Sequence, residues 1–140
     1  MVNCRRTDDG FTLIELVAVL VVTGMLAAIA IPVFLGQRAK AHDTSTKADV
    51  ATLGKEVATY FVDGNGSLTV DLVVEPGRAV LSDGHTSTSV NLTNGTAAPT
   101  SGSEANMSDP LRWCVALTDL RGRQKTYRYS AQVGLEPGAC

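Results

Sequence analysis

Glu15 is the residue of this sequence whose surroundings most clearly predict chemistry. It carries the only charge between Gly10 and Gln37. A carboxylate inside an apolar helix costs about 2.5–3.5 kcal/mol in a membrane and therefore usually has a partner. No Lys or Arg lies within helical reach of it. A cut after Gly10 would create a free α-amine on Phe11, four residues before Glu15, and such an amine is mostly charged at pH 7. We expect Glu15 to pair with the amine of a neighbouring copy; the alternative is that Glu15 merely lies at the headgroup boundary.

The residues after Glu15 predict a helix that cannot be buried in a small globule. Leu16 to Gln37 is a run of 22 uncharged residues, and a membrane-spanning helix needs roughly 20. Ala39 to Phe61 continues as an amphipathic helix, with apolar residues at helical spacing. These residues are Val50, Leu53, Val57, Tyr60 and Phe61. A single helix from Phe11 to Phe61 would be about 75 Å long, and Gly64-Asn65-Gly66 is suited to end it.

The remainder of the chain shows the alternation and turn residues of short strands. Strands are expected in 67–74, Arg78–Leu81, Thr86–Thr93, Trp113–Thr118 and Thr126–Gln132, with turns at Pro76-Gly77 and Ser82-Asp83-Gly84 and a hairpin around Arg121-Gly122-Arg123. The segment from Thr93 to Pro110 is expected to be an exposed loop. The predicted fold class is α+β, a long kinked N-terminal helix against an antiparallel sheet of about four strands. The predicted organisation is a leader (1–10), a membrane or core helix (11–37), its amphipathic continuation (38–63) and a β-rich domain (64–140).

Composition argues against several classes of function. Lys and Arg number 12 against 14 Asp and Glu, so no basic excess exists for direct binding of nucleic acid. No nucleophile–base pair, phosphate-binding glycine loop or metal-ligand spacing is present, and His42 and His85 are expected to be solvated. We therefore predict no catalytic residues, no metal and no cofactor, and a protein that is not an enzyme.

Three cysteines, Cys4, Cys114 and Cys140, fall on the two sides of the apolar run. If this run separates two compartments, Cys4 stays on the reducing side and the other two form an even pair on the oxidising side. A Cys114–Cys140 bridge would close a loop of 27 residues and stabilise the domain by about 3.5 kcal/mol in the chain-entropy model. The alternative is two free thiols.

The N-terminal segment GFTLIELV, from Gly10 to Val17, resembles the processing motif of type IV pilins and of type II secretion pseudopilins, and the resemblance continues through GMLAAIAIPVFL to Gln37-Arg38. It implies that a prepilin peptidase cuts between Gly10 and Phe11 and methylates the Phe11 amine. It also implies that Glu15 sets the register between subunits and that Pro32 bends or locally melts the helix. The acidic pair Asp8-Asp9 departs from the basic residue that many members carry there. The Cys114–Cys140 region resembles the disulfide-closed C-terminal region of many pilins.

The expected function is that of a structural subunit of a type IV pilus-like filament. The implied partners are copies of itself in a helical homopolymer, related pilins, the prepilin peptidase, and a membrane assembly platform with a separate ATPase. The protein would be stored in the bacterial cytoplasmic membrane and then reach the cell surface. A type II secretion pseudopilin is the main alternative, although the acidic calcium-binding segment expected of a major pseudopilin is absent. Arg5-Arg6 with Ala28-Ile29-Ala30 also fits a secretory signal peptide, and a single-span anchor is a further alternative.

Overall fold

A computed structural model describes residues 10–63, 71–75 and 77–140. The chain divides into two compact units, residues 1–37 and residues 38–140, and each is described by itself. Several predicted features lie outside the described residues. These are the leader up to Asp9, Cys4, the helix end at Gly64-Asn65-Gly66, the first residues of the first predicted strand, and Pro76.

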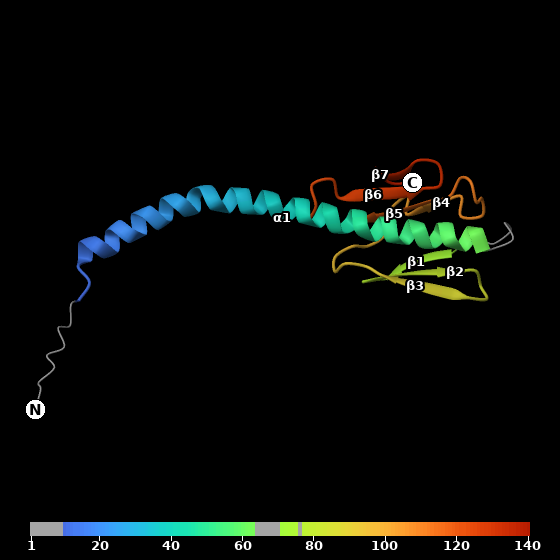
Figure 1. The fold of residues 1–140 in the computed structure, drawn as a ribbon, viewed down its shortest axis with the longest axis horizontal. Coiled ribbons are helices and arrows are strands. Elements are labelled where there is room, and N and C mark those ends of the chain that lie inside the picture. Colours follow the sequence, from blue (N-terminus) through green and yellow to red (C-terminus); the bar gives the residue numbers. More distant parts are fainter. Residues whose placement is uncertain (1–9, 64–70, 76) are drawn as a thin grey trace, which may run out of the picture. The chain divides into compact units, whose positions relative to one another are not determined.

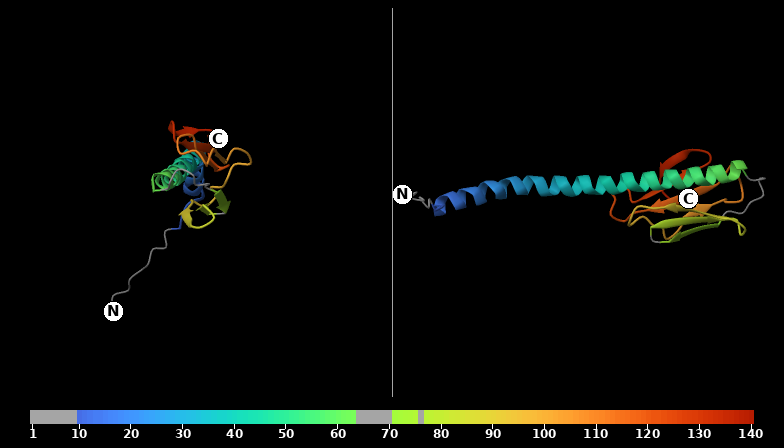
Figure 2. Two further views of the ribbon diagram at one scale, coloured as in Figure 1. Left: turned by 90° about the vertical axis from the view of Figure 1, so that its right-hand side faces the viewer. Right: turned by 60° about the horizontal axis from the view of Figure 1, so that its bottom comes forward.

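One helix, α1 (Leu13–Asp63), contains 51 residues and confirms the predicted long N-terminal helix (Figure 1 and Figure 2). It is helical without interruption on both sides of Pro32. Proline removes one backbone donor from a helix and can break it. No such break is seen at Pro32, so the structure does not show local melting there. A bend at Pro32 stays a prediction.

The first unit contributes the apolar part of α1. All its described residues, from Gly10 to Gln37, are exposed. Large side chains such as Phe11, Leu13 and Ile29 are 70–84% exposed. By length and composition, α1 could cross a membrane. Side chains of this kind in water would be unfavourable, so this segment needs lipid or other helices around it.

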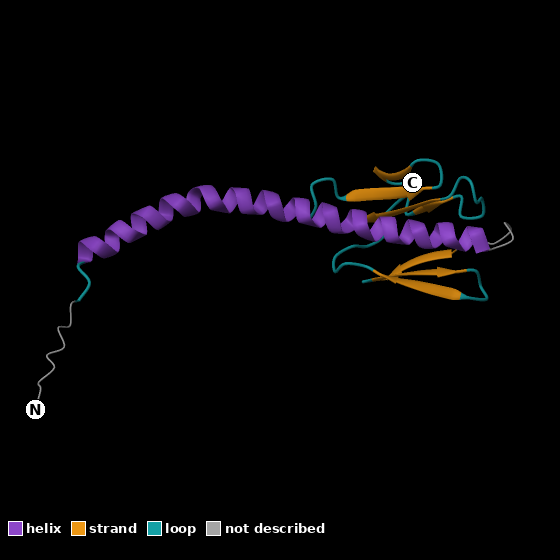
Figure 3. Ribbon diagram, in the orientation of Figure 1, coloured by secondary structure: helices purple, strands orange, loops and turns teal. Residues whose placement is uncertain are grey.

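The second unit contains two antiparallel sheets rather than the single sheet that was predicted (Figure 3). The first has the order β1-β2-β3, formed by β1 (Asp71–Glu75), β2 (Arg78–Ser82) and β3 (Ser87–Asn91). The second has the order β4-β5-β6-β7, formed by β4 (Glu104–Ala105), β5 (Cys114–Thr118), β6 (Thr126–Ser130) and β7 (Gly134–Pro137). The predicted hairpin is confirmed, since β5 pairs with β6 in the register Leu117↔Tyr127. The short strands β4 and β7 were not predicted.

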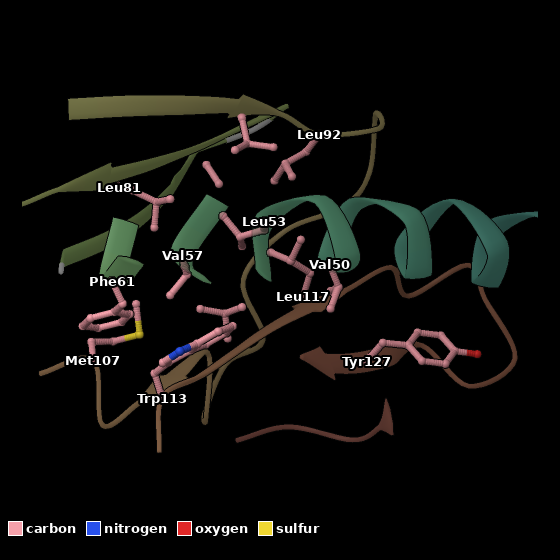
Figure 4. Close-up of a cluster of buried hydrophobic side chains, with 13 residues drawn as sticks. Val50, Leu53, Val57, Phe61, Leu81, Leu92, Met107, Trp113, Leu117 and Tyr127 are labelled. Carbon is pink, nitrogen blue, oxygen red and sulfur yellow. The ribbon is translucent and has the colours of Figure 1, made fainter. Parts of the chain in front are cut away.

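The core of the second unit forms between α1 and the strands (Figure 4). The predicted apolar stripe of α1 is confirmed, because Val50, Leu53 and Val57 are completely buried and Phe61 is nearly so. The Trp113 ring stacks on Phe61 and on Tyr129, with centroids 6.4 Å and 6.0 Å apart. Leu81 and Leu92 close the core from the side of the first sheet (Figure 4).

The segment from Thr93 to Pro110 is more ordered than the predicted exposed loop. Met107 and Thr96 are buried, Ala97 forms a bridge with Thr118, and β4 lies within this segment. Asp49 of α1 explains part of this order, because its carboxylate accepts hydrogen bonds from the backbone N and Oγ1 of Thr93 at 2.9 Å and 3.1 Å. Burying this carboxylate requires such donors, and Thr93 supplies two.

Candidate functional site

The candidate processing site at Gly10 and Phe11 is fully accessible. Both residues are exposed and precede the first helical residue. A Cβ built on Gly10 would meet no atom within 4 Å, and the Gly10 φ lies outside the positive range that favours glycine. The fold therefore does not demand glycine at this position. If glycine is required there, the requirement comes from an enzyme that must approach the backbone.

Glu15 lies at the start of α1 in a reciprocal arrangement with Thr12 that the sequence interpretation missed. Its Oε2 accepts hydrogen bonds from the backbone N of Thr12 at 2.9 Å and from Thr12 Oγ1 at 2.8 Å. The backbone N of Glu15 donates to Thr12 Oγ1 at 3.3 Å. This is a capping box, and its Thr-x-x-Glu spacing was visible in the sequence. The local partner lowers the cost of holding a carboxylate near lipid.

The capping box leaves Glu15 able to make a further contact. Both donors from Thr12 share Oε2, and Oε1 accepts no hydrogen bond from the residues that the structure describes. No basic side chain in the described part of the chain pairs with Glu15. The predicted cut lies before Phe11, so the Thr12 amide and hydroxyl would remain after processing. Among the described residues, Glu15 thus has one carboxylate oxygen without a hydrogen-bond donor.

The apolar segment satisfies its own polar groups without help from other parts of the chain. Thr23 Oγ1 donates to the carbonyl oxygens of Val19 and Leu20, at 2.8 Å and 3.1 Å. Gly24 and Gly36 face open space, since a Cβ at either position would meet nothing within 4 Å. Small residues allow close approach of helices in apolar surroundings. This segment is therefore suited to packing against other helices.

In the second unit, the loop between β5 and β6 is tied to α1 through Asp119. This carboxylate is only 1% exposed. It accepts hydrogen bonds from Nε and Nη2 of Arg121 at 2.9 Å and 2.8 Å, and His42 Nδ1 lies 3.2 Å from its Oδ2. The hydrogen bonds from Arg121 outweigh the effect of burial and hold the pKa of Asp119 below its ordinary value. The expectation that His42 is solvated was wrong, because its side chain is 19% exposed and faces Asp119; His85 is exposed.

The C-terminus is fastened to the second sheet by a disulfide between Cys114 and Cys140, with Cα atoms 5.9 Å apart. The backbone N of Cys140 also donates to the carbonyl of Gly102 at 3.0 Å. These contacts hold the segment after β7 near the start of β5. Among the described residues, no group of three or more His, Cys, Asp or Glu could hold a metal ion.

Comparison with known proteins gives matches of two kinds. The family model described as the prokaryotic N-terminal methylation motif matches residues 5–31. The type II secretion system core protein G of Aeromonas hydrophila is 33% identical over 61 residues, which cover 44% of this chain and 43% of that protein. The same protein of Pseudomonas aeruginosa is 36% identical over 59 residues, or 42% of each chain. The chain thus spans less than half the length of these relatives.

A second kind of match covers almost the whole chain. The type IV wide pilus major component of Thermus thermophilus is 33% identical over 138 residues, which cover 96% of this chain and 98% of that protein. No solved structure gives a significant match. The similarity to these secretion proteins covers at most half of the chain, while the similarity to the Thermus protein includes the β-rich part.

Proposed function

Because this chain belongs to the type IV pilin family, we propose that it is the precursor of a structural subunit of a type IV pilus-like surface filament. The observation that carries the proposal is the exposed apolar part of α1 directly behind a processing motif. A helix of this kind serves first as a membrane span and then as the core of a polymer. Association of copies through it is heterologous and does not close, which produces a filament.

The proposed sequence of events uses residues of this chain at each step. Residues 1–10 form the leader, and the prepilin peptidase cuts between Gly10 and Phe11 and methylates the Phe11 amine. Residues 11–37 hold the subunit in the bacterial cytoplasmic membrane. Glu15 then meets the amine of a neighbouring subunit, and Oε1 is the oxygen left open for it. Residues 38–63 and 64–140 form the part outside the membrane during storage, and the whole processed subunit reaches the cell surface within the filament.

The subunit itself supplies no chemistry in this scheme. Its family is structural, and the candidate residues have assembly roles rather than catalytic ones. The energy for extraction from the membrane comes from a separate ATPase at an assembly platform. Copies of the chain and related pilins are the proposed partners within the filament.

A type II secretion pseudopilus is the second candidate, because the core protein G relatives match the N-terminal part. We favour a pilus, since a relative that matches along nearly its full length is a pilus component. A secreted soluble protein or a single-span anchor would not explain that full-length similarity. These two alternatives also leave the open oxygen of Glu15 without a role.

Shearing of surface filaments from intact cells tests the proposal. We expect the processed chain in the sheared fraction, as filaments visible by electron microscopy and identified by mass spectrometry. Gly10→Val is the control, since it disturbs no contact of the fold. It should prevent processing, so that no copies of the chain appear in the sheared fraction. Wild-type protein that stays entirely with the membrane, with no surface filaments, would contradict the pilus assignment.

A further inference from the structure

The end of the second unit that follows the apolar segment is basic. Arg38 and Lys40 are the first charges after Glu15, and both are exposed. Arg38 lies about one helical turn before His42, and Lys40 about half a turn before it. His42 in turn contacts Asp119. The loop between β5 and β6 is therefore held near these two basic residues.

That loop adds more positive charge at the same end. The backbone N of Gln124 donates to Oδ1 of Asp43 at 3.1 Å, and Gly122 is buried against the same carboxylate. These contacts and the His42–Asp119 pair fix the loop against the first turns of the second unit. Arg123 and Lys125, on either side of Gln124, are exposed.

The positive charges at this end are not neutralised within the described structure. None of Arg38, Lys40, Arg123 and Lys125 forms an ion pair with a described residue. Two acids lie in this region: Asp119 pairs with Arg121 and contacts His42, whereas Asp43 accepts from the neutral backbone N of Gln124, which offsets no charge. Among the described residues, four unpaired basic side chains therefore stand against one carboxylate without a cationic partner. The surface is thus locally positive although the whole chain has a net charge of -2.

An exposed apolar side chain stands in the same loop. Leu120 is 77% exposed and lies next to Arg121 and close to Arg123. A leucine among basic residues is typical of surfaces that lie in the membrane interface, where apolar groups enter the headgroup layer and cations meet phosphates. We call Arg38, Lys40, Leu120, Arg123 and Lys125 the basic collar.

We propose that the basic collar docks on the anionic phospholipid headgroups around the base of the subunit while it is stored in the membrane. The inference rests on the proposed membrane storage through residues 11–37. If the hydrocarbon ends near Gln37, the five residues to His42 correspond to about 7.5 Å of helix rise. The headgroup layer is about 5–7.5 Å thick on each side of the bilayer. The loop that contacts His42 therefore lies at the outer boundary of the headgroup layer, where long Arg and Lys side chains can reach the phosphates.

The lipid partner is favoured over other partners by the position of the collar in the chain. Its first two members follow the membrane segment directly, so headgroups are always within reach during storage. Docking would hold the domain against the bilayer until the subunit is extracted. Each Lys or Arg near an anionic surface shifts the ratio of docked to free domain by about fivefold, and salt weakens the effect.

The test uses the full processed chain in nanodiscs, with one spin label at a time. Leu120→Cys carries the label in the collar. Val133→Cys is the matched control, because Val133 is also exposed, at 62%, and lies between β6 and β7, at the opposite end of the sheet from the β5–β6 loop. Processing removes Cys4, and Cys114 and Cys140 are bonded to each other, so the introduced thiol is the one labelled.

Accessibility of the label to a water-soluble nickel complex is compared in phosphatidylcholine discs and in discs that also contain phosphatidylglycerol. We expect protection at position 120 only in the anionic discs, and no protection at position 133. Arg123→Gln with Lys125→Gln should reduce the docked-to-free ratio about 25-fold and restore accessibility. Arg112→Gln, an exposed basic residue near the start of β5, should change nothing.

Equal accessibility of positions 120 and 133 in both kinds of disc would overturn the proposal. So would protection that persists without lipid charge or without Arg123 and Lys125. Protection seen only in discs with two or more copies would assign the collar to a second copy of the chain and would equally overturn it. A chain that does not enter nanodiscs at all would instead refute the membrane storage on which the proposal rests.

Discussion

Gly54→Ala is expected to destabilise residues 38–140, although alanine is the better helix former. Gly54 lies in α1 where Tyr129 of β6 packs against the helix backbone. A Cβ at this position would lie 2.5 Å from Cγ and Cδ1 of Tyr129 and 2.8 Å from its Cβ, and real Cβ atoms essentially never approach other atoms closer than 3.0 Å. The clash involves the root of the ring, and the ring also stacks on Trp113. Relief therefore requires movement of the helix or of β6.

The size of the effect follows from two opposing contributions. Overpacking of a core costs about 1–3 kcal/mol, and three close atoms at the root of an anchored ring place this case in the upper part of that range. Replacing glycine by alanine in a helix interior gains about 1 kcal/mol. The expected net loss is about 1–2 kcal/mol of unfolding free energy, which for a domain of this size lowers Tm by roughly 5–15 °C.

Thermal unfolding of the processed full chain in nanodiscs, followed by near-UV circular dichroism of the aromatic cluster, measures this loss. Tyr129→Gly provides the matched background, because it removes all three clashing atoms, the Cβ of residue 129 included, while keeping the helix. In that background Gly54→Ala should raise Tm, since only the helix gain remains. Unchanged or raised stability of Gly54→Ala in the presence of Tyr129 would refute the packing argument.

Three further predictions concern the bridge, the buried carboxylate and assembly. Cys140→Ser should lower the unfolding free energy by about 3–4 kcal/mol and expose the domain to proteolysis; mass spectrometry of the non-reduced protein checks the connectivity, and two free thiols would contradict it. Because the folded pKa of Asp119 is lowered, its stabilising contribution is complete above the unfolded value of about 3.9 and is lost as pH falls below it. Asp119→Asn should therefore flatten the stability profile below about pH 4 and lower stability at pH 7; an unchanged acid profile by denaturant unfolding would contradict this. Glu15→Ala should be cleaved normally but should accumulate in the membrane with few filaments, and wild-type filament numbers by electron microscopy would exclude the pairing role.

The long helix and its core stripe could be predicted because they depend on local patterns. An uncharged run from Leu16 to Gln37 and the spacing of Val50, Leu53 and Val57 are visible without any knowledge of the rest of the chain. The β5–β6 hairpin was predicted for the same reason, since two alternating segments flank an Arg-Gly-Arg turn. The Thr12–Glu15 capping box was equally local and could have been found from its spacing.

Contacts between distant residues could not be predicted in this way. His42 pairs with Asp119 and Asp49 binds Thr93, and nothing near either residue in the sequence indicates its partner. The packing of Tyr129 on Gly54 is likewise visible only in the folded chain. The strands β4 and β7 were missed because they have two and four residues, too few to show alternation. The division into two sheets was missed because it depends on which strands pair, and alternation within a strand does not identify its neighbour.

The N-terminus of the mature protein is the measurement that tests the central claim most directly. A filament subunit must keep the apolar segment that begins at Phe11, so intact mass and N-terminal sequencing of the protein from cells should give a start at Phe11 with one added methyl group. Gly10→Val should give the uncut chain, because the bulky side chain would obstruct the peptidase while the fold stays undisturbed. A start at Ile31, after Ala28-Ile29-Ala30, or normal processing of Gly10→Val, would contradict the account.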